Sequence, residues 1–578
     1  MIWYIENLLR NRSEREALEA LASSADWLEP VGWRIDSSLR LIWDANISTG
    51  GNTFPISLQY PNHFPHSPPS VLPRGDATRW SSHQYGPGGE LCLEYGPDNW
   101  HPDLTGADLI GSAHRLLEGE RPSPDGPGEV ASRHKTTLGQ DLRNTLMRFM
   151  ITRSLAELLS KVLPEQMLTA SVIGLFTKNT YVNLASSVVM PSGDTWTESL
   201  PKPLLKLGYE RPAAVLRWPD NSPLPSTESL TAFRAAIAGH NLQLPKVGHV
   251  ILAQGVLTHA YYLDEDDDTV FKVSVIPPPP VVARLDVGHL ALADRKVGIV
   301  GCGSLGSKLA VILARSGIGH FLLVDDDIFF PDNCVRHDLD WREAGAHKAD
   351  GVARRIELAN GAATCVVRKH RLGGQEASGS IESLIEGFAS CDLLIDTTAD
   401  PTVFNYLCAA VAGAKRPLLW AEVFGGGFGG LIARHRPQLE PDPASMRSAI
   451  ENWCADQGKP LPRPARDYGD GAKVPHIADD ADVTVIAAHA ARMAIDTLLP
   501  RDPSAYPNSV YLIGLAQGWI FEKPFETYPI DVGAPITGPD APAALDSDES
   551  AAELDRILQL FKEHKDAAAS SAASDQAT

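Results

Sequence analysis

The chain has 578 residues and a formal charge of −21 at pH 7, which argues against nucleic acid as the main partner, because phosphate binding calls for a basic face. Seven cysteines without a C-x-x-C pair indicate a reducing compartment and leave no zinc ribbon. Charged residues come too early for a signal peptide, and no apolar run reaches membrane-spanning length, so we expect a cytoplasmic protein of about three domains.

The first 120 residues predict a helix, a meander of strands, a proline-rich corner and a closing helix. The helices are expected at residues 13–24 and 105–117, the strands at 33–35, 39–43 and 53–58, and the corner at 60–71. Cys92 follows a Gly-Gly pair and precedes a polar loop. This setting favours an exposed nucleophile over the alternative, a buried core thiol.

Cys92 sits in a pattern that resembles the ubiquitin-conjugating enzyme family. Trp100 and Pro102 lie eight and ten residues beyond it, as in that family, and the resemblance covers residues 10–120. It implies an α+β domain in which Cys92 carries an acyl group as a thioester. The family's His-Pro-Asn, whose asparagine steadies the oxyanion during amine attack, is reduced to His-Gln-Tyr at residues 83–85. The transfer step therefore needs another hydrogen-bond donor for the oxyanion.

The next segment alternates helix and strand signals and carries no chemical motif. A helix is expected at residues 142–163, strands at 213–218, 247–252 and 261–263, and linkers at 119–136 and in the polyproline stretch 276–280. The acidic run at residues 264–268 reads as a solvated turn between two strands rather than a metal site.

A glycine motif organises the C-terminal half. Gly301, Gly303 and Gly306 carry the G-x-G-x-x-G spacing between an apolar strand at residues 297–300 and a helix at residues 307–315. The glycines let the backbone approach a phosphate, and the helix N-terminus offers free N–H groups and a positive dipole end. The pattern predicts a nucleotide site.

The acids and bases that follow keep a fixed order along the chain. A second strand at residues 321–324 ends in acids, where a nucleotide-binding βαβ unit places its ribose-binding carboxylate. The ordered set comprises Asp325, Asp327, Asn333, Arg336, Lys348 and Asp396. It resembles the ubiquitin-activating superfamily, which includes the bacterial activators of sulfur-carrier proteins of the ThiF/MoeB type. The match spans residues 282–535 and implies a Rossmann-like adenylation domain.

The resemblance implies a role for each side chain in the use of ATP and Mg²⁺. Arg336 and Lys348 neutralise charge that builds on the triphosphate, Asp325 holds the ribose, and Asp327 and Asn333 complete the nucleotide-binding set. Asp396 holds the magnesium, with Asp400 as a weaker second metal ligand. Arg284 is the candidate for the arginine that dimers of this superfamily insert into the partner's site.

Relatives that form a thioester carry their cysteine in the polar crossover before the helix predicted at residues 480–499. Cys454 is the thiol available there, and a packed helix thiol is the alternative. A second place used by some relatives is occupied by Ala472. Cys302 reads as structural, and the glycine tract at residues 424–430 either receives a partner's flexible tail or forms a simple hairpin turn.

The two resemblances combine into a multidomain protein of α+β and α/β class. The expected domains are a ubiquitin-conjugating-like domain at 1–135, an α/β linker domain at 136–280, an adenylation domain at 281–540 and a largely disordered tail at 541–578 with one helix at 553–564. The chain would adenylate the C-terminal carboxylate of a protein, pass the acyl group through Cys454 and Cys92, and join it to a lysine of a target protein.

This arrangement resembles the activating–conjugating fusions of bacterial antiphage operons of the cyclic-oligonucleotide (CBASS) type, in which the carboxylate belongs to a nucleotide cyclase. A homodimer is expected, without nucleic acid or membrane partners. Two alternatives stay open: a sulfur-carrier-protein adenylyltransferase without conjugating activity, and an NAD-binding oxidoreductase.

Overall fold

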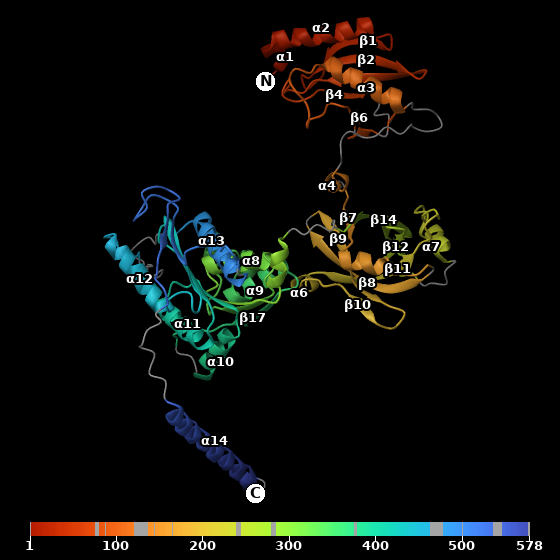
Figure 1. The fold of residues 1–578 in the computed structure, drawn as a ribbon. Coiled ribbons are helices and arrows are strands. Elements are labelled where there is room, and N and C mark those ends of the chain that lie inside the picture. Colours follow the sequence, from red (N-terminus) through yellow and green to blue (C-terminus); the bar gives the residue numbers. More distant parts are fainter. Residues whose placement is uncertain are drawn as a thin grey trace. The chain divides into compact units, whose positions relative to one another are not determined.

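The computed structural model divides into two compact units, residues 1–144 and 145–578 (Figure 1). It describes residues 2–75, 80–81, 83–86, 88–120, 137–143, 145–164, 166–177, 179–238, 244–278, 285–374, 378–462, 478–499, 501–535 and 546–575. The boundary expected near residue 280 lies inside the second unit, which contains two separate sheets.

The first unit is an antiparallel meander of four strands covered by two helices that pack on each other (Figure 1). Its elements are α1 (Trp3–Glu6), α2 (Leu8–Ser24), β1 (Leu28–Ile35), β2 (Leu41–Thr49), β3 (Asn52–Gln59), β4 (Ser70–Pro73), the short hairpin strands β5 (Gln84–Tyr85) and β6 (Glu90–Leu91), α3 (Gly106–Glu120) and α4 (Leu138–Asp141). Helix α2 begins five residues earlier than predicted, because the Asn7 side chain accepts the Arg10 N–H at 3.0 Å and caps it.

A buried carboxylate ties α2 to the start of α3. Glu14 is fully buried and accepts the Tyr60 hydroxyl at 2.8 Å and the Gly106 N–H at 2.7 Å. Arg10 pairs with the same carboxylate at 2.8 Å and donates to the carbonyls of Pro102 and Leu104. Burial raises the pKa of Glu14, and these partners act against that rise. The segment beyond Cys92 is thereby anchored to the core of the unit.

The first sheet of the second unit closes on itself. Strand β9 pairs with β7 on one side and with β8 on the other, so the order β9-β7-β14-β13-β12-β11-β8 returns to β9, and β10 is an appendage on β9. The strands are β7 (Met147–Met150), β8 (Met167–Thr177), β9 (Thr180–Val189), β10 (Thr195–Thr197), β11 (Tyr209–Arg217), β12 (Val247–Gln254), β13 (Leu257–Asp264) and β14 (Thr269–Ile276), with helices α5 (Arg153–Leu159), α6 (Lys202–Leu205) and α7 (Leu230–Ala238).

The prediction of a helix at residues 142–163 is wrong for the first half of this range. Residues 147–150 form β7, which pairs in parallel with both β14 and β9, and only α5 is helical. Pairing with β9 and with β14, which lies more than a hundred residues away, decides this assignment, and local spacing cannot report such partners. The three predicted strands are confirmed, and the acidic run is confirmed as the turn between β13 and β14.

The second sheet of this unit has the order β17-β16-β15-β18-β19-β20-β21-β22, parallel from β17 to β19 and antiparallel beyond. Its strands are β15 (Lys296–Val300), β16 (His320–Val324), β17 (Thr364–Arg368), β18 (Leu393–Asp396), β19 (Leu418–Val423), β20 (Gly429–His435), β21 (Val510–Gly514) and β22 (Thr527–Ile530). The helices are α8 (Ser304–Arg315), α9 (Lys348–Ala359), α10 (Ser378–Ala389), α11 (Pro401–Ala414), α12 (Pro443–Asp456), α13 (Asp480–Leu498) and three short 3-10 turns at Val287–Leu292, Pro331–Val335 and Trp341–Glu343.

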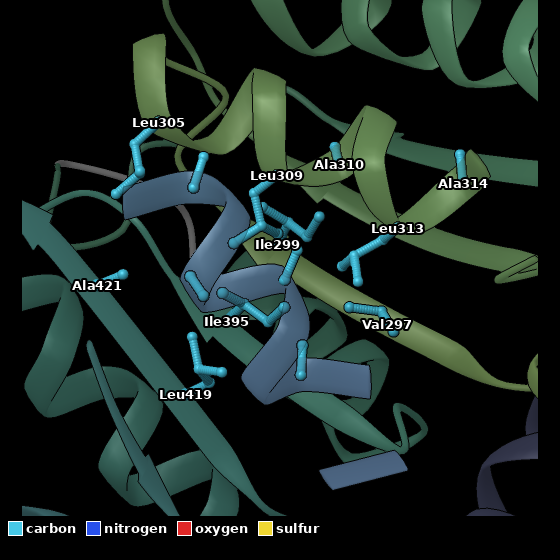
Figure 2. Close-up of a cluster of buried hydrophobic side chains, with 14 of the residues drawn as sticks. Val297, Ile299, Leu305, Leu309, Ala310, Leu313, Ala314, Ile395, Leu419 and Ala421 are labelled. Carbon is cyan, nitrogen blue, oxygen red and sulfur yellow. The ribbon is translucent and has the colours of Figure 1, made fainter. Parts of the chain in front are cut away.

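Helices cover both faces of this sheet. Apolar side chains of α8, α9 and α13 form one core against it, and those of α10, α11 and α12 form the other. Figure 2 shows the first core, where Leu309 and Leu313 of α8 face Val297 and Ile299 of β15. The expected strand–glycine turn–helix unit and the helix at residues 480–499 are confirmed, which fixes a mixed α/β fold around the glycine motif.

The remaining expectations concern loops and the tail. The glycine tract joins β19 to β20 as a hairpin turn, in which the Phe424 N–H donates to the Gly429 carbonyl at 2.8 Å. The tail was predicted to be largely disordered, with one helix at residues 553–564. In the structure a longer helix, α14, runs over Ser547–Asp575. Within the described residues, no helix combines the length and apolar character needed to cross a bilayer.

Candidate nucleotide site and candidate thiols

The polar residues singled out by the sequence meet where three parallel strands end. The register pairs Val300 of β15 with Val324 of β16 and with Asp396 of β18, so the carboxyl ends of these strands lie level. The glycine turn follows β15, and Asp325 follows β16 directly. In an open α/β sheet, ligands bind at this end of the strands, where the strand order reverses.

The glycine turn is closely packed at two of its positions and open at the third. Gly301 has φ +89°, a conformation that favours glycine, and a Cβ on Gly306 would lie 1.9 Å from the Gly301 carbonyl oxygen. A Cβ on Gly303 would meet nothing within 4 Å. Helix α8 begins at Ser304, three residues earlier than predicted, with Gly303 as its N-cap. Its N-terminus therefore faces the open part of the turn, which fits a phosphate group.

Replacing Gly306 with alanine is expected to collapse nucleotide binding, because the added methyl group must push the Gly301 carbonyl out of the turn. We expect ATP-dependent pyrophosphate exchange to slow about 100-fold, because a displacement of about 1 Å in a reacting geometry typically has an effect of this size. The thermal midpoint should also fall, since overpacking destabilises.

Gly303→Ala is the matched control, since its methyl group enters open space and leaves the fold intact. Its thermal midpoint should stay that of the parent, while any weakening of ATP binding would report direct contact with the nucleotide. Equal exchange rates for Gly306→Ala and the parent protein would contradict the close packing described above.

Two acids at the end of β16 hold the neighbouring backbone and a cation. Asp325 accepts the Cys302 N–H at 2.6 Å and the Asp327 N–H at 2.9 Å, and burial raises its pKa. Asp327 forms an ion pair with Lys348, the first residue of α9. Partial burial acts to raise the pKa of Asp327, but the Lys348 ammonium outweighs it and holds that pKa below its usual value. The structure thus brings Asp325, Asp327 and Lys348 together.

Asn333 and Arg336 lie on the connection between β16 and α9. The Asn333 side-chain oxygen accepts the Phe330 N–H at 2.9 Å and closes the 3-10 turn Pro331–Val335. The Arg336 N–H donates to the Asn333 carbonyl at 3.1 Å, and its side chain is half-buried. Asn333 therefore shapes the turn from which Arg336 projects.

Two residues that sequence reasoning missed hold the glycine turn in place. His337 is buried, its Nδ1 accepts the Leu339 N–H at 3.1 Å, and its Nε2 therefore carries the proton donated to the Cys302 carbonyl at 2.7 Å. Burial lowers the pKa of His337 to about 4, which keeps this neutral tautomer at neutral pH. The Thr397 hydroxyl donates to the Gly301 carbonyl at 2.7 Å. The sequence offers one signal for these two residues: His337 directly follows Arg336, and Thr397 directly follows Asp396.

The candidate metal ligand Asp396 is buried at the end of β18. It accepts the Thr398 N–H at 2.9 Å and the Thr398 hydroxyl at 2.6 Å, and burial, with a contribution from Asp400, raises its pKa to about 6. Asp400 itself accepts the Thr402 N–H at 2.7 Å as the N-cap of α11. Its carboxylate is therefore already engaged in capping a helix.

Glu422 on β19 is a further acid near Asp396 that the sequence did not indicate. Burial raises the pKa of Glu422 to about 7, the Asp396 charge adds to this rise, and Arg447 opposes it. Among the described residues, no three His, Cys, Asp or Glu side chains form a metal site by themselves. A magnesium ion at Asp396 would therefore complete its coordination with nucleotide phosphates and water, as Mg²⁺ commonly does.

The two candidate thiols lie in contrasting surroundings. Cys454 is fully buried on α12 beside Met446 and Ile450, and burial, with contributions from nearby acids, raises its pKa to about 11. Its geometry is that of a packed helix thiol. Arg284 and Ala472 lie outside the described residues.

Cys92 lies between two buried neighbours and is itself partly exposed. Leu91 and Leu93 point into the core, and the Cys92 N–H donates to the His83 carbonyl at 2.7 Å. The Trp100 indole donates to the Pro65 carbonyl at 2.7 Å and fixes the loop that follows. Burial and the nearby Asp98 raise the pKa of Cys92. The thiol is accessible but stays protonated at neutral pH without further activation.

Comparison with known proteins identifies the part of the chain that carries the glycine motif. Residues 284–441 match the ThiF family. The C-terminal half contains a ThiF domain. The match runs from the segment before β15 to the end of β20 and includes the glycine turn, the acids of β16 and Asp396.

Several curated proteins are similar to part of this chain. They are an uncharacterized protein, y4qC, of Sinorhizobium fredii (29% identical over 38% of this chain and 40% of the relative), the ATP-dependent ubiquitin transferase-like protein Cap2 of Escherichia coli (32%, 22% and 22%) and the sulfur carrier protein ThiS adenylyltransferase of Escherichia coli (29%, 26% and 58%). The alignments thus span less than two thirds of each of these relatives. A crystal structure of Escherichia coli MccB with ATP aligns with TM-score 0.33 and 18% identity over 44% of this chain and 68% of MccB.

Proposed function

We propose that the ThiF domain activates the C-terminal carboxylate of a protein by adenylation with ATP and Mg²⁺. The observation that carries this proposal is the meeting of the glycine turn, Asp325, Lys348 and Asp396 at the level ends of three parallel strands. The similarity to a sulfur-carrier adenylyltransferase and to a ubiquitin transferase-like protein supports it.

ATP supplies the α-phosphate that the carboxylate attacks, with pyrophosphate as the leaving group. The open side of the glycine turn and the N-terminus of α8 receive phosphate oxygens, and Arg336 and Lys348 neutralise the charge that builds there. Lys348 must exchange its contact with Asp327 for one with phosphate. Asp325 and Asp327 face the ribose side, and Asn333 keeps the turn before Arg336 in shape.

Asp396, with Asp400 as the weaker second acid, would hold Mg²⁺ beside the phosphates. In a homodimer, Arg284 would reach the partner's site. The Asp396 assignment follows from the ordered set of residues, and the Arg284 assignment follows from the resemblance to the ubiquitin-activating superfamily.

We further propose that the acyl group moves to thiols and then to an amine. Cys92 is the final carrier, because a thioester on a partly exposed cysteine can meet a lysine of a target protein. Cys454 is the candidate first thiol, and its burial requires α12 to shift before it can be acylated. A carboxylate donor of the nucleotide-cyclase class, in an antiphage operon, fits the similarity to the ubiquitin transferase-like relative.

The second candidate is a sulfur-carrier-protein adenylyltransferase that does not conjugate. The similarity to the ThiS adenylyltransferase favours it. Under this alternative, adenylation proceeds, but no product depends on Cys92.

Intact-mass analysis with ATP, after co-expression with the neighbouring genes and without reductant, tests the relay. We expect a protein-sized adduct that a thiol reductant removes and that Cys92→Ala abolishes. Cys454→Ala should also abolish it if Cys454 is the first thiol, and Cys408→Ala, which removes a half-buried thiol on α11, is the matched control. An adduct insensitive to Cys92→Ala, or pyrophosphate exchange without any adduct, would favour the sulfur-carrier alternative.

A further inference from the structure

The hairpin that presents Cys92 has two chemically different faces. The register pairs Gln84 with Leu91 and Tyr85 with Glu90, and the Cys92 N–H to His83 carbonyl bond continues this pairing by one step. Because side chains alternate along a strand, His83, Tyr85, Glu90 and Cys92 share one face, while Gln84 and Leu91 share the other.

The glutamine on the opposite face is fully occupied with holding the loop. Gln84 is buried, and its side-chain oxygen accepts the N–H groups of Trp80 and Ser81 at 2.5 and 2.9 Å. Its Nε2 donates to the Gly89 carbonyl at 2.7 Å. Although Gln84 is the one amide in the His-Gln-Tyr segment, it points away from the Cys92 face and cannot serve a reacting thioester there.

Tyr85 is the hydroxyl donor on the Cys92 face. Tyr85 is 47% exposed, and Glu90, its cross-strand partner, lies beside it on the same face. Burial of the hydroxyl, the Glu90 charge and the proximity of the Cys92 thiol all raise the pKa of Tyr85. The phenol therefore keeps its proton and stays a hydrogen-bond donor throughout the neutral and mildly basic range.

We propose that Tyr85 is the catalytic donor that stabilises the oxyanion formed when an amine attacks the thioester on Cys92. This inference rests on the proposed conjugating function. The amine nitrogen bonds to the thioester carbon, and the carbonyl oxygen becomes an oxyanion that accepts a hydrogen bond from the Tyr85 hydroxyl. Collapse re-forms the carbonyl and breaks the carbon–sulfur bond. The Cys92 thiolate takes up the proton lost by nitrogen, which leaves an amide and a free thiol.

A discharge assay on the full-length protein tests this role apart from adenylation. A synthetic peptide with a C-terminal thioester acylates the protein by thiol exchange, and the Cys92→Ala variant gives the background from the other cysteines. Free lysine is then added, and intact mass follows the loss of the adduct. Tyr85→Phe should load to the same extent as the parent and discharge about 100-fold more slowly, as for the loss of one oxyanion donor.

Two further variants separate catalysis from a structural role. Tyr95→Phe removes a phenol from the loop after Cys92 and should discharge at the parent rate. Glu90→Gln removes the charge beside Tyr85, which lowers the pKa of Tyr85 and strengthens its hydroxyl as a donor, so discharge should accelerate. If the Tyr85–Glu90 pair had only a structural role, changing either partner would slow discharge.

The outcomes distinguish the inference from the proposed function. If the loaded parent discharges and Tyr85→Phe keeps its rate, the inference is overturned. Slowing by Glu90→Gln to the level of Tyr85→Phe would also overturn it. If the parent's Cys92 adduct does not discharge to lysine at all, the conjugating function itself fails.

Discussion

Asp396→Asn is expected to abolish pyrophosphate exchange and, at the same time, to raise the thermal stability of the nucleotide-free protein at pH 7. Exchange fails because the proposed metal ligand loses its charge. Stability rises because burial lifts the pKa of Asp396 to about 6, so ionising it in the folded protein costs up to about 3 kcal/mol relative to an ordinary aspartate. Asparagine retains the oxygen that accepts both Thr398 hydrogen bonds.

The direction in which the stability of the folded protein changes with pH tests this cost of ionising Asp396. A raised pKa means that the folded state holds the proton while the unfolded chain has released it, so stability falls as pH rises from about 4 to about 6. Denaturation at pH 5 and pH 7 should show this loss in the parent and a smaller one in Asp396→Asn. Asp400→Asn keeps the helix cap and removes only the smaller Asp400 contribution to the pKa of Asp396, so it should retain most of the parent's loss. A variant less stable than the parent at pH 7 would contradict the burial cost.

Asp496→Ala is expected to destabilise the second unit by about 3–5 kcal/mol, the cost of leaving a buried charge without its partner. Arg434 on β20 is fully buried and donates to Asp496 on α13 at 2.7 Å, to the Ser504 hydroxyl at 3.1 Å and to the Tyr506 carbonyl at 2.9 Å. Without Asp496, no anion compensates the guanidinium. Urea denaturation followed by a probe in this unit measures the effect.

The double variant Arg434→Met with Asp496→Leu separates charge from packing. Replacing both partners by apolar side chains removes the uncompensated charge, so it should recover much of the stability lost in Asp496→Ala. If the single and double variants were equally unstable, the loss would come from packing instead of charge. Arg436→Met, at a half-buried pair with Glu440, should cost less than Asp496→Ala.

The placement of the glycine turn and of the acids beside it is predictable from the sequence because its signals are local. The spacing of Gly301 and Gly306 predicts the turn. Asp325 and Asp396 stand at the ends of apolar strands, and parallel pairing places these strand ends side by side. His337 and Thr397 escape prediction because their roles depend on carbonyl groups of the distant glycine turn. Glu422 approaches Asp396 only through sheet packing.

Elements outside this site also escape prediction where contacts with distant residues decide their structure. Residues 147–150 carry apolar side chains that suit either a helix or a strand, and pairing with distant β14 decides the outcome. In the Cys92 loop, the segment His-Gln-Tyr contains no asparagine. Which of its side chains faces the thiol follows from the cross-strand register, and that register cannot be read from spacing alone.

The closed ring of β7 to β14 limits how this protein can capture an extended peptide. Binding by strand addition needs a row of unpaired main-chain N–H and carbonyl groups along a sheet edge. Strand β9 bonds on both sides and the ring order returns to its start, so within the described residues each ring strand has a neighbour on both sides, and the short β10 adds a small outer edge. The first part of β14, residues 269–273, also pairs with β13 alone, so the ring offers only short stretches for an added strand. The longer open edges belong to the other sheets, at β1, β4, β17 and β22.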